Sequence, residues 1–323
     1  MFCSTVIPTI GRPELSRAVC SVLEQTFTAD DFEVIVVNDS GKPLPESKWQ
    51  ESERVQIIHT KRRERCVARN AGAAIARGKY LHFLDDDDWL LPGALENFWA
   101  LARQSDANWL YGSSQLVDRQ GQPLIQLHHG MNGNCFIQTM AGEWIPLQSS
   151  CIKTEAFFAI GGFSPLILAT QDVDLCRRIA LRGDLASTSN LVACIGMGIE
   201  GSVTDYNRGP IYSRQAREKI LNEPGVFARM RASANSSYWY GRIVRVYLTS
   251  AIWNLQHRKI FTMASRIMFA IAGVASVNWR ILSLAFWRAV TKAYESETFL
   301  RGFREANRVV ERRGIVTSKN QTA

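Results

Sequence analysis

Continuous apolar runs alternate with amphipathic stretches along the first two thirds of the chain. The apolar runs, which predict buried strands, cover residues 3–7, 32–37, 55–58 and 80–84. The amphipathic stretches, which predict helices, cover residues 14–25, 65–77, 92–102, 155–160 and 173–182. We expect the first strand to break at Pro8, because proline has no N–H group to donate to a sheet. Buried strands that alternate with helices predict an α/β fold with a doubly wound, mostly parallel sheet flanked by helices.

The pattern changes from about residue 205 onward. Glycine becomes infrequent, and aromatic residues alternate with arginine and lysine. Spacing of three and four positions would place these apolar side chains on one helical face: Ile260, Met263, Ile267, Ala270 and Val274. We therefore expect a mainly helical extension over residues 205–323, after a first domain over residues 1–204. The apolar stretch of the extension is shorter than the ~18–20 residues that cross a bilayer.

Charge is divided between these two parts. The chain has 323 residues and a net charge of +8. Residues 1–204 hold 18 Lys and Arg against 23 Asp and Glu, whereas residues 205–323 hold 20 against 7. Interleaved basic and aromatic residues favour binding of an anionic membrane surface through residues 240–295. The alternative is a helical subdomain that packs on the first domain or on a second subunit of a homo-oligomer.

Cysteine usage and the N-terminus bear on the compartment. The seven cysteines have neither a C-x-x-C spacing nor a Cys/His array that would bind zinc. Several lie in apolar runs, which indicates small core residues in a reducing compartment. The N-terminus leads almost directly into a strand, without the pattern of a signal peptide. We expect a cytoplasmic protein, peripheral on the inner face of the cell membrane if its extension binds lipid.

Four consecutive aspartates, Asp85 to Asp88, follow a strand expected to be buried. Their charges repel one another, so a cation is expected to join them. Ligands of open α/β sheets bind at the carboxyl ends of the strands, and carboxylate oxygens suit Mg²⁺ or Mn²⁺. Thr9 and Asp39 end neighbouring strands at the same edge. The alternative is a solvated acidic turn that caps the helix near Pro92.

Five sequence blocks, in this order, resemble the family 2 glycosyltransferases, which have the GT-A fold. The blocks are Val6-Ile7-Pro8-Thr9 with Arg12-Pro13-Glu14, Val36-Val37-Asn38-Asp39-Ser40, Ala68-Arg69-Asn70-Ala71-Gly72, Phe83-Leu84-Asp85-Asp86-Asp87-Asp88, and Gly161-Gly162-Phe163 with Gln171-Asp172-Val173-Asp174. The resemblance covers residues 3–204, with a nucleotide-sugar half over about 1–110 and an acceptor half over about 111–204. The basic extension lies outside it.

The resemblance implies how the nucleotide sugar is bound. Thr9 and Asp39 match positions that hold the uracil and ribose of a UDP-sugar, and Pro8 belongs to the same nucleotide-sugar site. Arg69 matches an arginine that lies near the nucleotide.

The resemblance also implies a metal site and a base. Asp85 and Asp87 match the D-x-D motif, in which the last aspartate contacts a divalent cation, Mn²⁺ or Mg²⁺, on the diphosphate. Asp86 could be the ribose or phosphate partner instead of Asp85. Asp172 matches the general base that deprotonates the acceptor hydroxyl. Gln171 stands where the family has a glutamate, so one carboxylate beside the base is missing.

These assignments imply an inverting, metal-dependent sugar transfer to a hydroxyl of a glycan or lipid-linked acceptor. One base without a protein nucleophile means a single displacement. A sugar nucleotidyltransferase is an alternative, although residues 9–13 form a poor version of its glycine-rich, basic loop. A nucleic-acid-binding protein that uses the basic extension is the other alternative, but it leaves the aspartates unexplained, because without a metal they would repel phosphate.

Overall fold

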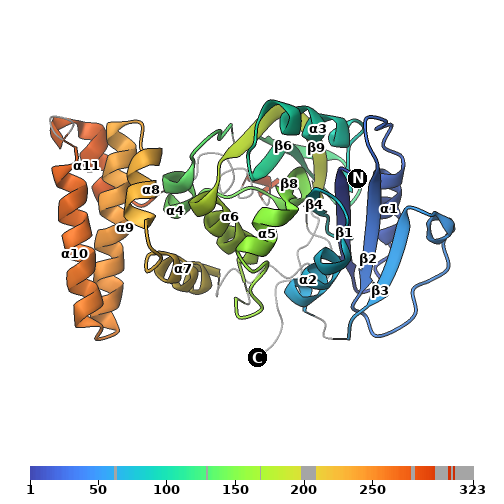
Figure 1. Cartoon of the computed structure of the whole chain (residues 1–323), viewed down its shortest axis with the longest axis horizontal. Helices are drawn as coiled ribbons and strands as arrows, with labels where there is room; N and C mark the ends of the chain where they lie inside the picture. Colours follow the sequence, from blue (N-terminus) through green and yellow to red (C-terminus); the bar gives the residue numbers. More distant parts are fainter. Residues whose placement is uncertain are drawn as a thin grey trace.

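The computed structural model describes residues 1–61, 64–128, 130–167, 169–197, 209–277, 281–294, 305–306 and 308–309. Within them, nine strands form one mixed sheet with helices on both faces (Figure 1). The strand order is β3 (Val55–His59), β2 (Phe32–Asn38), β1 (Cys3–Thr9), β4 (Tyr80–Phe83), β8 (Ser150–Lys153), β6 (Trp109–Val117), β9 (Leu185–Gly196) and β5 (Trp89–Leu90), while β7 (Pro123–Leu127) pairs with β6. The predicted α/β class is confirmed.

Parallel pairing joins the first four strands of this order, and β6 also runs parallel to β9. The other pairings, β4 with β8, β6 with β8, β6 with β7 and β5 with β9, are antiparallel. The carboxyl ends of β1, β2 and β4 therefore meet at one edge of the sheet.

The prediction that the first strand ends at Pro8 is wrong. Pro8 pairs with Val37 inside β1, which continues to Thr9. The pairing of β1 with β4 ends at Val6, whose carbonyl accepts from Leu84 N at 3.1 Å. The backbone N–H and C=O groups of successive residues point to opposite neighbouring strands, so the nitrogen of Pro8, like the carbonyl of Val6, faces β4. No hydrogen bond to β4 is required at that position, and proline is therefore tolerated there.

Two apolar cores fill the two faces of the sheet. Alternation along β2 sends Val34 and Val36 into one core and Ile35 and Val37 into the other. The first core lies under α1 (Leu15–Leu23) and α3 (Ala94–Gln104), and the second lies under α2 (Arg65–Ile75), α5 (Thr154–Ala159) and α6 (Gln171–Arg182). All seven cysteines are free, and six of them are buried, as expected for core residues.

Gly72 sets how closely α2 approaches the sheet. A Cβ atom there would lie 2.9 Å from Val37 Cγ2 and closer still to Val6 Cγ1. Glycine therefore lets the backbone of α2 rest directly on β1 and β2. This contact fixes the height of Arg69, one turn earlier on the same helix.

The described part of the extension is helical, and it stands at the end of the molecule opposite β3 (Figure 1). It consists of α7 (Gly209–Ile220), α8 (Val226–Ser233), α9 (Ser237–Gln256), α10 (Ile260–Ala275) and α11 (Leu284–Thr291), with α4 (Phe136–Ala141) beside it. The second apolar core continues from the sheet into α9 and α11. The expected boundary near residue 204 lies outside the described residues. Among those residues, no helix meets the length and apolarity that a bilayer crossing requires.

Candidate active site

The four aspartates lie where the parallel strands end, as the sequence predicts. Asp85 to Asp88 follow β4 directly, and Thr9 ends β1. Asp39 follows β2, and its backbone N–H donates to Thr9 O at 2.8 Å. The β1 and β2 ends are thus bonded to each other beside the acidic segment.

Asp86 is buried and firmly held. It accepts a hydrogen bond from Thr9 Oγ1 at 2.6 Å and an ion pair from Arg12 Nη1 at 2.8 Å. Burial raises the pKa of Asp86, while Thr9 and Arg12 oppose that shift. Arg12 also reaches Asp87 Oδ2 at 3.1 Å, so one guanidinium joins two of the aspartates.

Asp85 is the most exposed of the four carboxylates, and it pairs with Arg69. It also accepts from Gln148 Nε2 at 3.1 Å. Burial alone would raise the pKa of Asp85, but Arg69 and Arg65 hold it below its ordinary value. Arg69 is 4% exposed, stacks over the ring of Phe163 at 5.3 Å, and has a buried Nε without a partner.

Asp87 and Asp88 carry negative charge that the nearby cations do not balance. Burial, followed by the charge of Asp85, raises the pKa of Asp87 to about 7, although Arg12 opposes the shift. Burial and the charge of Asp87 also raise the pKa of Asp88 well above its ordinary value. Asp88 Oδ1 accepts from Gly196 N at 2.7 Å, which joins the aspartates to the end of β9.

The donor set fits a divalent cation. One carboxylate oxygen from each of Asp85, Asp87 and Asp88 lies within 4.8 Å of the others. Clustered carboxylates are the ligands that Mg²⁺ and Mn²⁺ prefer, and an added cation would lower the raised pKa values. The sequence prediction placed the metal on Asp87 in a D-x-D pair with Asp85; the structure adds Asp88 to this set.

Asp39 organises the segment between β3 and α2. Its two carboxylate oxygens accept from Thr60 Oγ1 and from Glu64 N, both at 2.7 Å. The Glu64 side chain in turn caps α2 by accepting from the Cys66 and Val67 backbone N–H groups. Asp39 therefore fixes the start of the helix that carries Arg69.

Asp172 lies in the first turn of α6 and is half-buried. Burial raises its pKa, while the Val173 N–H and the charge of Arg69 lower it. Arg69 thus interacts electrostatically with both Asp85 and Asp172. Thr170, just before the helix, has φ 60°, a left-handed backbone that a β-branched residue rarely adopts. Such strain is often stored at functional sites.

Asp174 has a structural role. It forms an ion pair with Arg178 at 2.6 Å, one turn along α6. Arg178 Nη1 also donates to the Ile160 and Gly162 carbonyls, at 2.9 and 2.8 Å. This network ties α6 to the loop after α5.

The same loop is held from its other side by Asn70. Asn70 Nδ2 donates to Phe163 O at 2.9 Å, and Phe163 N donates to Asn70 Oδ1 at 3.0 Å. Gly162 has φ +67°, and a Cβ there would lie 2.8 Å from Asn70 Oδ1. Two adjacent residues of α2 therefore contact two different parts of the site. Arg69 contacts Asp85, and Asn70 holds the loop after α5.

The structure brings together the predicted residues Thr9, Asp39, Arg69, Asp85, Asp86 and Asp87. Asp172 joins them through its electrostatic interaction with Arg69, and Pro8 adjoins Thr9 in β1.

Sequence reasoning assigned no role to Arg12, Asp88 or Gln148. Arg12 could have been found, since it belongs to the first block, and Asp88 belongs to the acidic run. Gln148 carried no signal, because it reaches Asp85 only through the pairing of β8 with β4.

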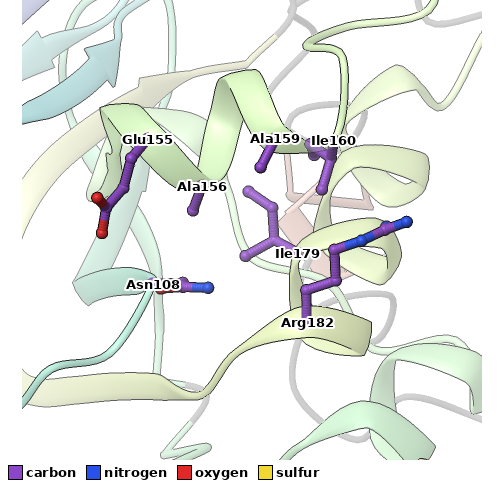
Figure 2. A pocket seen from close by; sticks show the side chains of 7 residues that line it. All are labelled: Asn108, Glu155, Ala156, Ala159, Ile160, Ile179 and Arg182. Atoms are coloured by element: carbon purple, nitrogen blue, oxygen red, sulfur yellow. The ribbon is translucent and has the colours of Figure 1, made fainter.

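A cavity of about 330 Å³ lies apart from these residues, between α5 and the end of α6 (Figure 2). Its lining consists of Asn108, Glu155, Ala156, Ala159, Ile160, Ile179 and Arg182. Arg182 and Asp172 are at opposite ends of α6, which at 1.5 Å per residue places them about 15 Å apart along the axis. No carboxylate of the acidic segment lines this cavity, so it is not the candidate active site.

Comparison with known proteins identifies the family. Residues 4–167, half of the chain, match the model of glycosyl transferase family 2, and the chain belongs to this family. An uncharacterized glycosyltransferase of Rickettsia bellii is 33% identical over 217 residues, which are 65% of this chain and 31% of that protein. TarP of Staphylococcus aureus, a poly(ribitol-phosphate) beta-N-acetylglucosaminyltransferase, is 30% identical over 115 residues, or 34% of this chain and 35% of that protein. The chain spans about a third of the length of these two relatives.

A solved structure supports the fold assignment. This structure is of residues 1–349 of S. aureus TarS in complex with UDP-GlcNAc. The match covers 82% of this chain and 90% of the TarS chain. The TM-score is 0.53 at 13% sequence identity, so the similarity concerns the fold.

Proposed function

We propose that this protein transfers a sugar from a nucleotide-diphosphate sugar, a UDP-sugar in the favoured case, to a hydroxyl of a glycan or lipid-linked acceptor. The observation that carries the proposal is the cluster of Asp85, Asp87 and Asp88 at the strand ends, linked through Arg69 to Asp172. Membership of glycosyl transferase family 2 and the UDP-GlcNAc bound to TarS agree with it. TarP is named as a poly(ribitol-phosphate) transferase and GgaB from Bacillus subtilis as a minor teichoic acid biosynthesis protein, and these names favour a cell-surface polymer as acceptor.

The nucleotide half of the site is assigned to the ends of β1, β2 and β4. Pro8, Thr9 and Asp39 are proposed to contact the base and ribose. Asp85, Asp87 and Asp88 would hold a divalent cation, which would neutralise the charge that grows on the diphosphate leaving group. The unpartnered Nε of Arg69 is a donor that an anionic ligand can use.

Asp172 is proposed as the general base. Burial raises its pKa, which makes this carboxylate more basic than an exposed one. It accepts the proton of the acceptor hydroxyl as that oxygen attacks the anomeric carbon and the nucleotide diphosphate leaves. A single displacement of this kind inverts the anomeric centre. Arg69 interacts with both Asp172 and Asp85, and it is proposed to hold the base at a fixed position relative to the leaving group.

The test measures UDP release from a panel of UDP-sugars, UDP-GlcNAc among them, with Mn²⁺ or Mg²⁺. We expect turnover that chelation removes and that Asp87→Asn lowers at least 100-fold. Glu155→Gln, an exposed carboxylate in the cavity of Figure 2, is the matched control and should keep full activity. Pyrophosphate release from a nucleoside triphosphate and a sugar phosphate would instead favour the nucleotidyltransferase. Release of neither product, or of pyrophosphate alone, would overturn the proposal.

A further inference from the structure

The α9–α10 hairpin lies at the end of the molecule far from β3 (Figure 1). It carries an extended surface of exposed apolar side chains. We name it the hairpin face. Its exposed side chains are Leu248, Ile252 and Leu255 of α9 and Ile260, Phe261, Ile267, Met268 and Ile271 of α10. Phe261 is 94% exposed, and Met268 is 67% exposed. Large exposed apolar patches on a soluble fold mark interaction sites.

The two exposed rows share one side of the hairpin. Phe227 of α8 packs on Tyr247 and on Phe269, so α8 covers one side of the α9–α10 pair. At about 100° per residue, Ile267 and Ile271 point roughly opposite to Phe269. On α9, Leu248 and Ile252 are turned by at least about 100° from Tyr247. Both rows therefore turn away from α8 and form a single surface.

Neither helix buries this surface within the described chain. The buried residues of α10 are Arg266, Ala270 and Gly273, and Phe269 stacks on Tyr247 of α9. This differs from the expected apolar face over residues 260–274, since Ile260 and Ile267 are exposed while Ala270 is buried. The apolar residues of α10 thus exceed what the bundle core uses.

The charge of this region indicates what the hairpin face meets. Residues 224–294 contain ten arginines and lysines and no aspartate or glutamate. Arg242 and Arg245 are used internally, since they donate to the last carbonyls of α11, and Arg266 is buried against Ser250. The remaining exposed cations include Arg258 and Lys259, in the turn between α9 and α10 directly before Phe261.

We propose that the hairpin face docks on an anionic lipid surface, with α9 and α10 lying in the plane of the interface. Apolar side chains would enter the boundary between headgroups and acyl chains, and Arg258, Lys259 and Arg288 would contact lipid phosphates. A second copy of the chain fits this surface less well, because two such faces would bring like charges together without an acidic partner. The lack of a bilayer-crossing helix in the described residues agrees with interfacial binding.

The test is cosedimentation of the full chain with vesicles. One set of vesicles contains phosphatidylcholine with about 30% phosphatidylglycerol, which supplies negative charge. The other set contains phosphatidylcholine alone. We expect binding to the anionic vesicles, reduced by salt, and little binding to the neutral ones. Phe261→Ser with Ile271→Ser should weaken binding more than tenfold, and Arg258→Gln with Lys259→Gln should weaken it severalfold. Leu166→Ser, 78% exposed on the sheet domain, is the matched control and should bind like the wild type.

Three results would overturn the proposal. The first is equal sedimentation with and without anionic vesicles. The second is binding that the hairpin variants do not change. The third is a dimer, seen by sedimentation equilibrium without lipid, that Phe261→Ser with Ile271→Ser dissociates, since this would assign the hairpin face to a second copy. UDP release measured without vesicles tests the proposed function separately, because none of these variants touches the aspartate site.

Discussion

Asn70 and Phe163 hydrogen bond to each other in both directions across 93 positions of sequence, at 2.9 and 3.0 Å. The pair joins α2, which carries Arg69, to the loop that leads toward Asp172. Because Arg69 and Asn70 are adjacent, the position of one residue constrains the other. The geometry between the aspartate cluster and Asp172, the proposed base, therefore depends on the side-chain amide of Asn70.

Replacement of Asn70 by alanine should uncouple these two parts of the site. Two backbone groups of Phe163 would lose their partner, which should cost about 1–3 kcal/mol of unfolding free energy. Transfer activity should fall at least tenfold at saturating donor, since Asp172 would lose its fixed distance from Arg69. Asn70→Asp is the control: it can still accept from Phe163 N but cannot donate to Phe163 O. An alanine variant with wild-type turnover would contradict this coupling.

The aspartate cluster should make metal-free stability depend on pH. The pKa of Asp87 is raised to about 7 in the folded protein, so the folded state binds a proton more tightly than the unfolded state. The contribution of Asp87 to the free energy of unfolding should then be highest at acidic pH and decrease as pH rises from about 4 to 7. Asp86 and Asp88 shift in the same direction. Thermal unfolding with EDTA at pH 5.5 and pH 8 measures the effect.

Adding Mn²⁺ to the same protein should restore stability at pH 8 and have little effect at pH 5.5, where protons compete for the ligands. Asp87→Asn removes one ligand and one repelling charge. This variant should unfold at a higher temperature than the wild type in EDTA at pH 8 and respond less to Mn²⁺. Equal stabilisation of both proteins by Mn²⁺ would place the cation elsewhere.

Asp172 and Asp174 should separate chemistry from structure. Asp172→Asn should lower kcat by at least about 100-fold, in line with loss of a general base, and leave donor binding nearly unchanged. Asp174→Asn should instead lower unfolding free energy by about 2–3 kcal/mol, because Arg178 loses its buried partner. The wild-type rate should decrease on the acidic side as Asp172 is protonated, with a midpoint above the ordinary aspartate pKa. Nucleotide affinity, kcat and thermal unfolding of both variants distinguish the two roles.

Gly72→Ala should lift α2 away from the sheet. The new methyl group would lie too close to Val6 and Val37, with an expected cost of about 1–3 kcal/mol from overpacking. Since Arg69 is on the same helix, its contact with Asp85 should loosen, and Mn²⁺-dependent stabilisation should change with it. Val6→Ala added to Gly72→Ala should recover part of the lost stability. Failure of this second change to recover any would mean that the close approach is not the cause.

Most of the site could be predicted because its residues follow strand ends in the sequence. Asp85 directly follows an apolar run, Thr9 and Asp39 come two positions after one, and parallel strands bring such positions to one edge. Gln148 and Gly196 could not be found this way, because Gln148 precedes β8, which pairs antiparallel with β4, and Gly196 ends β9, which joins the sheet beside β6. The local hydrophobic pattern of a strand does not indicate which other strand it pairs with. The role of Asn70 likewise depends on a contact between distant segments.

The extension shows a different limit. Helical periodicity predicted an amphipathic helix over residues 260–274 but not which face the bundle would bury. The buried face of α10 contains Arg266 and Gly273, because Arg266 donates to Ser250 and Gly273 allows Val244 to approach. A charged residue in the core and isoleucines outside it reverse the usual assumption. Pairing of polar groups between α9 and α10 decides the orientation, and a single helix does not reveal it.

Pro8 gives the strand ladder a fixed stopping point. Without an N–H group at this position, β1 cannot extend its hydrogen-bonded pairing with β4 beyond Val6. The two strands are free to diverge there, and the four aspartates form the turn that follows β4. Had the pairing continued, the residues after β4 would have stayed in an extended strand beside Thr9. The point at which β4 gives way to the acidic segment thus coincides with a missing N–H group, one residue before Thr9.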